Sequence, residues 1–376
     1  MTTPTTTRPD EQATETPELE SRRITSGQLP TWAPWAILAG AMAIAFAVFA
    51  VMNLEADLAD FNIVGALFVG MVMYIVFIGV LSAIAESRRH AIDRLMTALI
   101  STAFVLACLP LASVLWTVVI NGLDRFDMTF FTWSMRNVVA EGGGAVHAIW
   151  GTLIITGLAT IISVPIGLMT SIYLVEYGAG GKLAKGITFF VDVMTGIPSI
   201  VAGLFIYSVF ALLMGPGVRM GIMGALSLCV LMIPVVVRGS EEMLRIVPNE
   251  LREASYALGV PKWLTIVKVV LPTSIAGITT SVVLAIARVI GETAPLLLTA
   301  GFTANMQLNA FESGNGQMMT LPVFVYNQVM YPSASAPDES IARAWAAALT
   351  LLVIVMALNL IARLVSKFFA PKTRGR

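Results

Sequence analysis

The sequence has little charge, and this scarcity excludes whole classes of protein. Only 12% of its 376 residues are charged, whereas a soluble globular domain carries about a quarter. A chain this poor in charge cannot cover a surface that faces water, so lipid is the expected solvent. The formal net charge is zero, which removes the basic excess that nucleic-acid binding requires.

Cysteine and histidine are equally scarce. The two cysteines, Cys108 and Cys229, lie in separate apolar runs without a C-x-x-C spacing, which indicates neither a disulfide framework nor a metal site. His90 and His147 each stand alone beside an expected membrane boundary, and we expect both to be interfacial. We therefore expect no catalytic residue, no metal and no cofactor in this chain.

Long apolar runs, by contrast, are plentiful. A bilayer core of about 30 Å needs roughly 20 apolar residues in a helix, and the backbone polar groups of such a span must pair internally. Eight runs of that length predict an all-α polytopic membrane protein with about eight transmembrane helices. The runs lie near residues 33–53, 62–85, 93–120, 147–173, 187–214, 218–238, 272–300 and 342–366.

The distribution of Lys and Arg predicts the orientation of these helices. With the N-terminus inside, 18 of the 23 basic residues fall in inside segments, four fall in outside segments, and Arg288 lies in a span. We therefore predict that both termini are cytoplasmic. Residues 121–146 and 301–340 are then outside, and the second segment contains LPVFVYNQVMY, which suits a short interfacial or re-entrant piece.

Composition divides the chain into four parts. Residues 1–32 are rich in Thr, Pro and Glu, which predicts a disordered cytoplasmic tail. Residues 33–90 hold two transmembrane helices, residues 91–370 hold six more, and residues 371–376 form a second cytoplasmic tail. The longest charged stretch between spans, residues 241–271, is expected to be a cytoplasmic loop.

This loop is expected to fold as a pair of short helices. Pro248 and Asn249 suit the start of a helix, Gly259 suits its end, and Val260-Pro261 begins a second helix. On shape alone, an ordinary pair of interfacial helices fits equally well. The first helix offers apolar side chains that are available to dock against a partner: Leu251, Ala254, Tyr256 and Leu258.

The spacing inside the loop decides between these interpretations. The chain reproduces Glu-Ala-Ala, three residues, Gly, nine residues, Ile-x-Leu-Pro, with Ser255 in place of Ala and Val269 in place of Ile. This pattern resembles the coupling helix of binding-protein-dependent ABC importer permeases, which sits in a groove of an ATPase subunit. The resemblance implies coupling to such an ATPase through Glu253, Ala254, Ser255, Gly259, Leu271 and Pro272.

ATP hydrolysis is expected on that partner and not on this chain. A phosphate-binding loop needs G-x-x-x-x-G-K-[ST]. The nearest stretch, Gly178 to Leu183, lacks the Ser or Thr that would hold Mg²⁺. We therefore expect a transport subunit that is not itself an enzyme.

Ionisable residues inside spans are candidates for function, because burying them in lipid is costly. Arg288 and Glu292 lie four residues apart, a spacing that places both on one helix face where they can pair. Gly291 leaves room for a ligand, and Pro295 is expected to kink the helix. An arginine fork beside a broken helix suits an oxyanion. A structural ion pair is the alternative. Arg238, expected at the end of the sixth helix, is either part of the pathway or an interfacial arginine.

Three stretches closely resemble the A-type permease subunits of phosphate-specific (Pst) ABC importers. The resemblance covers about residues 95–370 and six spans, and it implies an inner-membrane permease core for phosphate. It places Arg288, Glu292 and Arg238 on positions tied to phosphate passage. It also implies three partners: a second, related permease subunit, a homodimeric ATPase and an extracytoplasmic phosphate-binding protein. The stretches are TGIPSIVAGLF at 195–205, VPNELREASYALGVPKW at 247–263 and LAIARVIGETAPLLLTAG at 284–301.

Three alternatives remain open. A permease for sulfate or molybdate would share the coupling loop, and only the Arg-x-x-Gly-Glu-Thr-Ala-Pro stretch argues for phosphate. A secondary transporter would show internal repeats with paired broken helices, and we find no convincing repeat. A purely structural membrane subunit would not need Arg288 in a span.

Overall fold

The computed structural model describes most of the chain as helix, arranged in two compact units, Met1–Ser113 and Val114–Arg376. Most of the tail predicted at 1–32, and the whole of the tail predicted at 371–376, lie outside the described residues. The boundary between the units falls inside one long helix, and the domain boundary predicted at residue 90 stays a prediction. The described residues are 29–52, 62–86, 88–178, 180–313 and 316–369.

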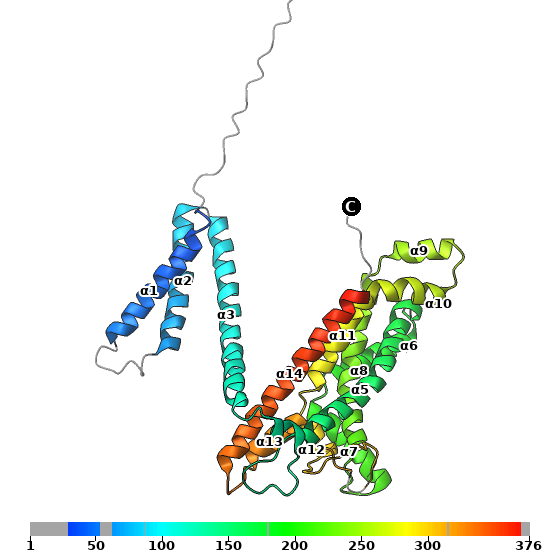
Figure 1. Ribbon diagram of the computed structural model, residues 1–376. Helices are drawn as coiled ribbons and strands as arrows, with labels where there is room; N and C mark the ends of the chain where they lie inside the picture. Colours follow the sequence, from blue (N-terminus) through cyan, green and yellow to red (C-terminus); the bar gives the residue numbers. More distant parts are fainter. Residues whose placement is uncertain (1–28, 53–61, 87, 179, 314–315, 370–376) are drawn as a thin grey trace, which may run out of the picture. The chain divides into compact units, whose positions relative to one another are not determined.

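The first unit is built from apolar helices that approach closely through small residues. Its elements are α1 (Ala33–Met52), α2 (Ile63–Ala85) and the first part of α3 (Arg88–Leu123) (Figure 1). Ala45 of α1 and Ala66 of α2 are fully buried, and a Cβ built on Gly70 would lie 2.6 Å from the sulfur of Met42. Small side chains of this kind are what helices use to pack in lipid.

Glu86 fixes the turn between α2 and α3. Its carboxylate accepts hydrogen bonds from the Leu29 N–H at 2.7 Å and the Ser82 hydroxyl at 2.5 Å, and it pairs with Arg94 at 2.8 Å. Burial raises the pKa of Glu86, but the hydrogen bonds from Ser82, Leu29 and Arg94 outweigh it and lower the pKa to about 2. The ionised carboxylate therefore joins Leu29, which precedes α1 by four residues, to Arg94 in the second turn of α3.

The regular secondary structure of the second unit is helical throughout its described residues. A π-helical turn (Tyr173–Tyr177) extends α5, and another (Ile266–Val270) joins α10 to α11 without a break. The helices that follow α3 are α4 (Met128–Thr132), α5 (Val146–Ile172), α6 (Lys182–Thr195), α7 (Ser199–Met214), α8 (Gly221–Ile246), α9 (Asn249–Ala257), α10 (Lys262–Thr265), α11 (Leu271–Val289), α12 (Ala294–Thr299), α13 (Leu321–Met330) and α14 (Pro337–Phe369).

The helices confirm a multi-pass membrane protein. Seven described helices are long and apolar enough to cross a bilayer, and the pair α6 and α7 makes eight if it forms one span. This pair bends by 108°, so the continuous helix expected over 187–214 is wrong. The reason is Pro198, which lacks an N–H to continue the helix and disfavours helical geometry at Ile197. The segment at LPVFVYNQVMY forms the short helix α13.

Three helices, α5, α8 and α11, form the centre of the second unit by packing in that order. A Cβ built on Gly167 of α5 would lie 2.7 Å from a methyl of Val236 in α8. A Cβ built on Gly239 of α8 would lie 2.6 Å from the Cβ of Ser281 in α11. Glycines at these crossings let the backbones come close enough to exclude lipid.

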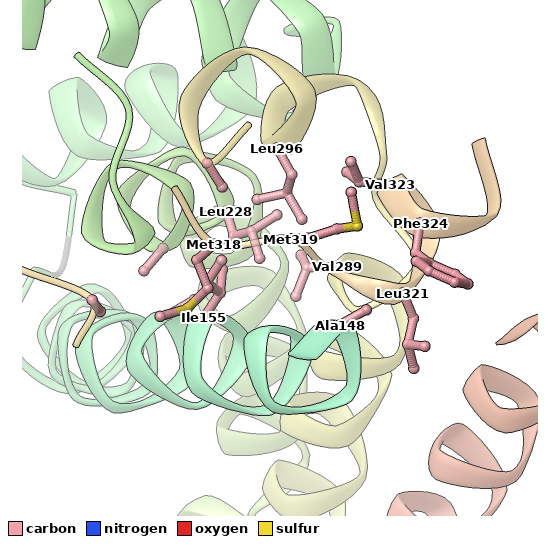
Figure 2. Close-up of a cluster of buried hydrophobic side chains, with 14 of the residues drawn as sticks. Ala148, Ile155, Leu228, Val289, Leu296, Met318, Met319, Leu321, Val323 and Phe324 are labelled. Atoms are coloured by element: carbon pink, nitrogen blue, oxygen red, sulfur yellow. The ribbon is translucent and has the colours of Figure 1, made fainter. Parts of the chain in front are cut away.

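The main core of the second unit lies away from α9 and α10, where α12 and α13 fold back onto the central helices. Ile155 of α5, Leu228 of α8 and Val289 of α11 meet Leu296 of α12 there, and all four are buried (Figure 2). Met318, just before α13, closes the same cluster. This core fixes the place where the chain leaves α11 and enters α12.

Candidate functional site

The charged loop forms a pair of short helices at one end of the second unit (Figure 1). The predicted pair of helices is therefore confirmed. The first helix, α9, starts after Pro248 and ends before Gly259, whose φ of +73° suits glycine. The second, α10, starts after Pro261. The predicted bounds of 241–271 are too wide, because α8 continues to Ile246 and α10 runs on into α11.

A buried ion pair anchors α9 to the extension of α5. The side chains of Arg252 and Glu176 are 12% and 4% exposed, and two guanidinium nitrogens of Arg252 donate to Glu176 Oε1 at 2.8 and 3.0 Å. Arg252 also donates to the carbonyls of Leu244 and Val247 at 3.0 and 2.6 Å. All three guanidinium nitrogens of Arg252 thus have acceptors, and such additional hydrogen bonds help a buried pair to hold its geometry.

Further contacts join α10 to α9 and to the extension of α5. The hydroxyls of Ser255 and Thr265 are both buried and lie 2.8 Å apart. The Lys262 ammonium donates to the carbonyl of Glu176 and lies 4.9 Å from the ring centroid of Tyr177. We call α9 and α10, residues 249–265, the coupling hairpin.

The outward surface of the coupling hairpin is apolar and uncovered. Leu251, Tyr256 and Leu258 are 42%, 40% and 83% exposed, and Glu253 and Ala254 are exposed beside them. Leu271 and Pro272 lie in the first turn of α11, the former half-buried and the latter exposed. The exposure expected of the apolar side chains is confirmed, while contact with an ATPase stays a prediction.

The predicted helix break is present, but it starts earlier than Pro295. Helix α11 ends at Val289, and α12 begins at Ala294. Pro295 lies in the first turn of α12, where its missing N–H has no cost. A Cβ built on Gly203 of α7 would lie 2.6 Å from the Cα of Pro295, so the break is packed tightly on one side. A Cβ built on Gly291 would meet nothing within 4 Å, so it is open on the other.

The break separates Arg288 from Glu292. Arg288 is exposed in the last turn of α11, and half-buried Glu292 lies beyond the helix end, with its N–H donating to the carbonyl of Val289 at 3.1 Å. The expectation that both lie on one helix face is therefore wrong. Within the described part of the chain, no hydrogen bond or ion pair joins the two side chains. The guanidinium of Arg288 forms none with any other described residue either.

Arg238 lies inside α8 and not at its end, which corrects the sequence expectation. Its guanidinium pairs with Asp192 of α6 and with Glu241 at 2.8 Å. The side chain of Glu241 is 7% exposed and also pairs with Arg245 at 2.6 Å. Arg238 therefore links α6 to α8, and a groove of about 370 Å³ opens beside this link, lined by Lys185 among others.

Arg238 and Arg288 lie at different levels of the same helix pair. Gly239 of α8 faces Ser281 of α11, and Gly277 faces Met243, so the helices run antiparallel. Arg238 is then level with residue 282, and Arg288 lies six residues further along α11, roughly 9 Å at 1.5 Å per residue. The structure thus places the two cations on neighbouring helices but in separate environments.

Sequence reasoning missed two buried residues on the side away from the coupling hairpin. Arg343 of α14 is 1% exposed, and its only sequence signal is its place between alanines in an apolar helix. His147 is 2% exposed, and it lies at the start of α5, so the expectation of an interfacial histidine stays a prediction while the burial was not foreseen. In the described residues, no group of three or more His, Cys, Asp or Glu is placed to hold a metal ion.

Several known proteins are similar to this chain in sequence or in structure. Phosphate transport system permease protein PstA 1 of Mycobacterium tuberculosis (strain CDC 1551 / Oshkosh) is 44% identical over 290 residues, which are 76% of this chain and 92% of that protein. PstA of Yersinia pestis is 38% identical over 69% of this chain and 83% of its own length. A solved structure of the MetNI methionine ABC transporter covers 60% of this chain and 96% of its own, with 19% identity and a TM-score of 0.48.

The family model covers more than half of the sequence. It describes the binding-protein-dependent transport system inner membrane component and matches residues 163–375, which include the coupling hairpin and the helix break. Together with relatives that are more than 30% identical over most of their length, this match shows the family. The chain belongs to the binding-protein-dependent transport system inner membrane component family.

Proposed function

We propose that this chain is the transmembrane permease subunit of an ATP-driven phosphate importer. The observation that carries the proposal is the 44% identity to a phosphate transport system permease over 92% of that protein's length. The family model, which matches residues 163–375, includes both the coupling hairpin and the helix break.

Phosphate passage is proposed at the break between α11 and α12. Arg288 is exposed there beside Gly291, where the backbone leaves open space. A guanidinium without a carboxylate partner can offer its planar fork of donors to an oxyanion, and it offsets part of the cost of moving a charged ligand through lipid. Glu292, at the mouth of the same break, repels an anion and keeps binding weak enough for release.

Arg238 is proposed as a second station, closer to the coupling hairpin. Its charge is shared between Asp192 and Glu241, so an arriving oxyanion must compete with two carboxylates. This arrangement suits a gate between α6 and α8 that opens when the helices shift. It also suits a purely structural link, and uptake by Arg238→Lys against Arg238→Gln distinguishes the two.

The coupling hairpin is proposed to dock into an ATPase subunit, which hydrolyses the ATP. Its exposed apolar side chains offer the contact surface, and the pair formed by Arg252 and Glu176 carries motion from the hairpin into α5. The complete importer is proposed to contain a second permease subunit, an ATPase dimer and an extracytoplasmic phosphate-binding protein. Glu253, Ala254, Ser255, Gly259, Leu271 and Pro272 are assigned to coupling.

The proposed orientation places both termini and the coupling hairpin in the cytoplasm. Single cysteines at Ser313 and Thr373, in a background without Cys108 and Cys229, test it with an impermeant thiol reagent. Labelling at position 313 from outside intact cells is expected. Labelling at position 373 from outside would refute the orientation.

Uptake of radiolabelled phosphate tests the proposed function. Cells that lack their own high-affinity phosphate import are expected to regain it when this chain is expressed with its partner subunits. Sulfate and molybdate uptake, measured in the same cells, serve as controls. Restored sulfate or molybdate uptake without phosphate uptake would assign the permease to the other oxyanion.

A further inference from the structure

A second polar cavity lies at the end of the second unit opposite the coupling hairpin. It measures about 320 Å³ and is formed by the start of α5, by α13 and by the loop that follows α12 (Figure 1). Its polar lining comes from His147, Thr303, Asn327 and Gln328, and two phenylalanines form part of its apolar wall. The helix break and the coupling hairpin use none of these residues.

His147 is the feature of this cavity that a packing role does not explain. The side chain is 2% exposed, yet neither ring nitrogen has a hydrogen-bond partner in the described structure. Its ring packs edge-on against Phe324, with the centroids 5.6 Å apart. Buried polar atoms are almost always paired, and a ligand bound in this cavity could supply the partner that the imidazole of His147 lacks.

The surroundings of His147 are electropositive. His147 is the second residue of α5, a helix of 27 residues, so the positive end of the helix dipole lies at the cavity. Residue Ala145 at the helix start provides no side-chain cap. None of the residues that line the cavity is acidic.

Arg343 adds a buried positive charge behind the cavity wall. Its guanidinium donates to neutral acceptors, namely Gln328 Oε1 at 3.0 Å, the Ser340 hydroxyl at 3.0 Å and the carbonyl of Gly142 at 2.8 Å. No carboxylate within the described residues forms an ion pair with it. Because Arg343 occupies the oxygen of Gln328, the amide nitrogen of Gln328 is left to donate elsewhere. The amide of Asn327 supplies a further donor on the same helix.

We propose that this cavity is a receiving site for a tetrahedral oxyanion, ahead of the helix break. Its side-chain N–H donors match oxyanion acceptors, and none of the residues that line it offers a carboxylate to a metal cation. A neutral imidazole and two amides bind an oxyanion less tightly than several arginines would. Weak binding suits a site that has to release its ligand to the next part of the pathway. The identification of that oxyanion as phosphate rests on the proposed function.

Protection of a cysteine placed in the cavity tests this site directly. Thr303→Cys is made in a background without Cys108 and Cys229, and the purified importer without its binding protein is treated with a thiol reagent. Inorganic phosphate is expected to slow the reaction, and chloride at equal ionic strength is not. Because the complex is in detergent, the result does not depend on membrane orientation.

Two substitutions in this background sharpen the test. His147→Phe removes the ring nitrogens and keeps the aromatic packing. Gln328→Glu keeps an acceptor for Arg343 but replaces the amide donor with a negative charge. Each is expected to raise the phosphate concentration needed for protection about tenfold or more, the effect of losing one hydrogen bond to a charged ligand. His90→Phe, a change of the other histidine in the separate first unit, is the matched control and is expected to have no effect.

The outcomes separate the site from the proposed function. Protection by sulfate or molybdate but not by phosphate would support the receiving site and contradict phosphate as the substrate. Protection by the binding protein alone, with no effect of any oxyanion, would show a protein docking surface and overturn the proposal. Unchanged protection in both His147→Phe and Gln328→Glu would overturn it as well, provided that the complexes assemble in normal amounts.

Discussion

The coupling hairpin and the helix break treat their charges in opposite ways. In the hairpin, Arg252 pairs with the buried carboxylate of Glu176 from the extension of α5, and the apolar side chains face outward. At the break, Arg288 is exposed with no carboxylate partner in the described chain, and the backbone around Gly291 leaves open space. Paired charges hold a segment in one geometry, whereas an unpaired charge is available to bind a transported ligand.

This difference assigns distinct tasks to the two regions. A transmitting element has to keep its shape under load, which a buried and satisfied ion pair supports. A residue on the transport pathway has to bind and release the ligand. A guanidinium whose N–H groups are all bonded within the protein cannot do so. Arg238 lies between these cases, because it is paired but half-exposed.

Removing the charge at the break is expected to have the largest effect. Arg288→Gln should lower phosphate uptake roughly 100-fold, because a hydrogen bond to a charged group contributes up to about 3 kcal/mol. Arg288→Lys keeps the charge without the fork and should retain partial activity. Uptake and recovery of the assembled complex are measured together, and normal uptake by Arg288→Gln would contradict the assignment.

Breaking the ion pair that anchors the coupling hairpin to α5 is expected to have the next largest effect. Arg252→Met leaves the Glu176 carboxylate buried without its partner, a change that costs about 3–5 kcal/mol in comparable sites. We expect loss of transport-coupled ATP hydrolysis, and the double variant Glu176→Gln/Arg252→Met should recover part of it. Glu242→Gln, an exposed acid in the last turns of α8, is the control. Equal coupling in Arg252→Met and the control would show that the pair is dispensable.

A smaller effect is expected from the turn of the hairpin. Gly259 has a φ of +73° with nothing within 4 Å of a built Cβ, so a side chain there meets backbone strain and not a clash. Gly259→Val should lower coupled hydrolysis about tenfold, and Gly259→Asn should lower it less, because Asn tolerates the left-handed region. Gly186→Val, an equally open glycine in helix α6, controls for the added side chain. Equal effects at the two glycines would remove the argument from backbone conformation.

The smallest effect concerns Glu86, a paired charge in the first unit. Its folded pKa of about 2 lies below the ordinary 4.5, so its stabilisation is complete above pH 4.5 and is lost as the pH falls toward 2. The Tm of the purified chain should therefore exceed that of Glu86→Gln at pH 7. The gap should narrow between pH 4.5 and 2.5, and a gap that stays constant over this range would contradict the pairing.

Sequence reasoning predicted the parts of this molecule that depend on local pattern. Apolar run length located the spans, and Pro248, Gly259 and Pro261 located the coupling hairpin within a residue or two. It failed where distant segments meet. Nothing local pairs Glu176 with Arg252, 76 residues apart.

The helix break shows a second kind of limit. The spacing of Arg288 and Glu292 predicts a pair only if the helix continues between them. The helix ends at Val289, and the close packing of Gly203 in α7 against Pro295, at the start of the new helix, is a long-range contact that the spacing does not reveal. The burial of His147 likewise depends on Phe324, far along the chain.

One measurement tests the account most directly: phosphate uptake and subunit recovery for Arg288→Gln, Glu292→Gln and the double variant. If Arg288 binds the ligand and does not pair with Glu292, the double variant assembles normally and stays inactive, as Arg288→Gln does. If the two residues form a structural ion pair instead, each single variant reduces assembly and the double variant restores both assembly and uptake. Full uptake by the double variant would contradict the transport station at the helix break.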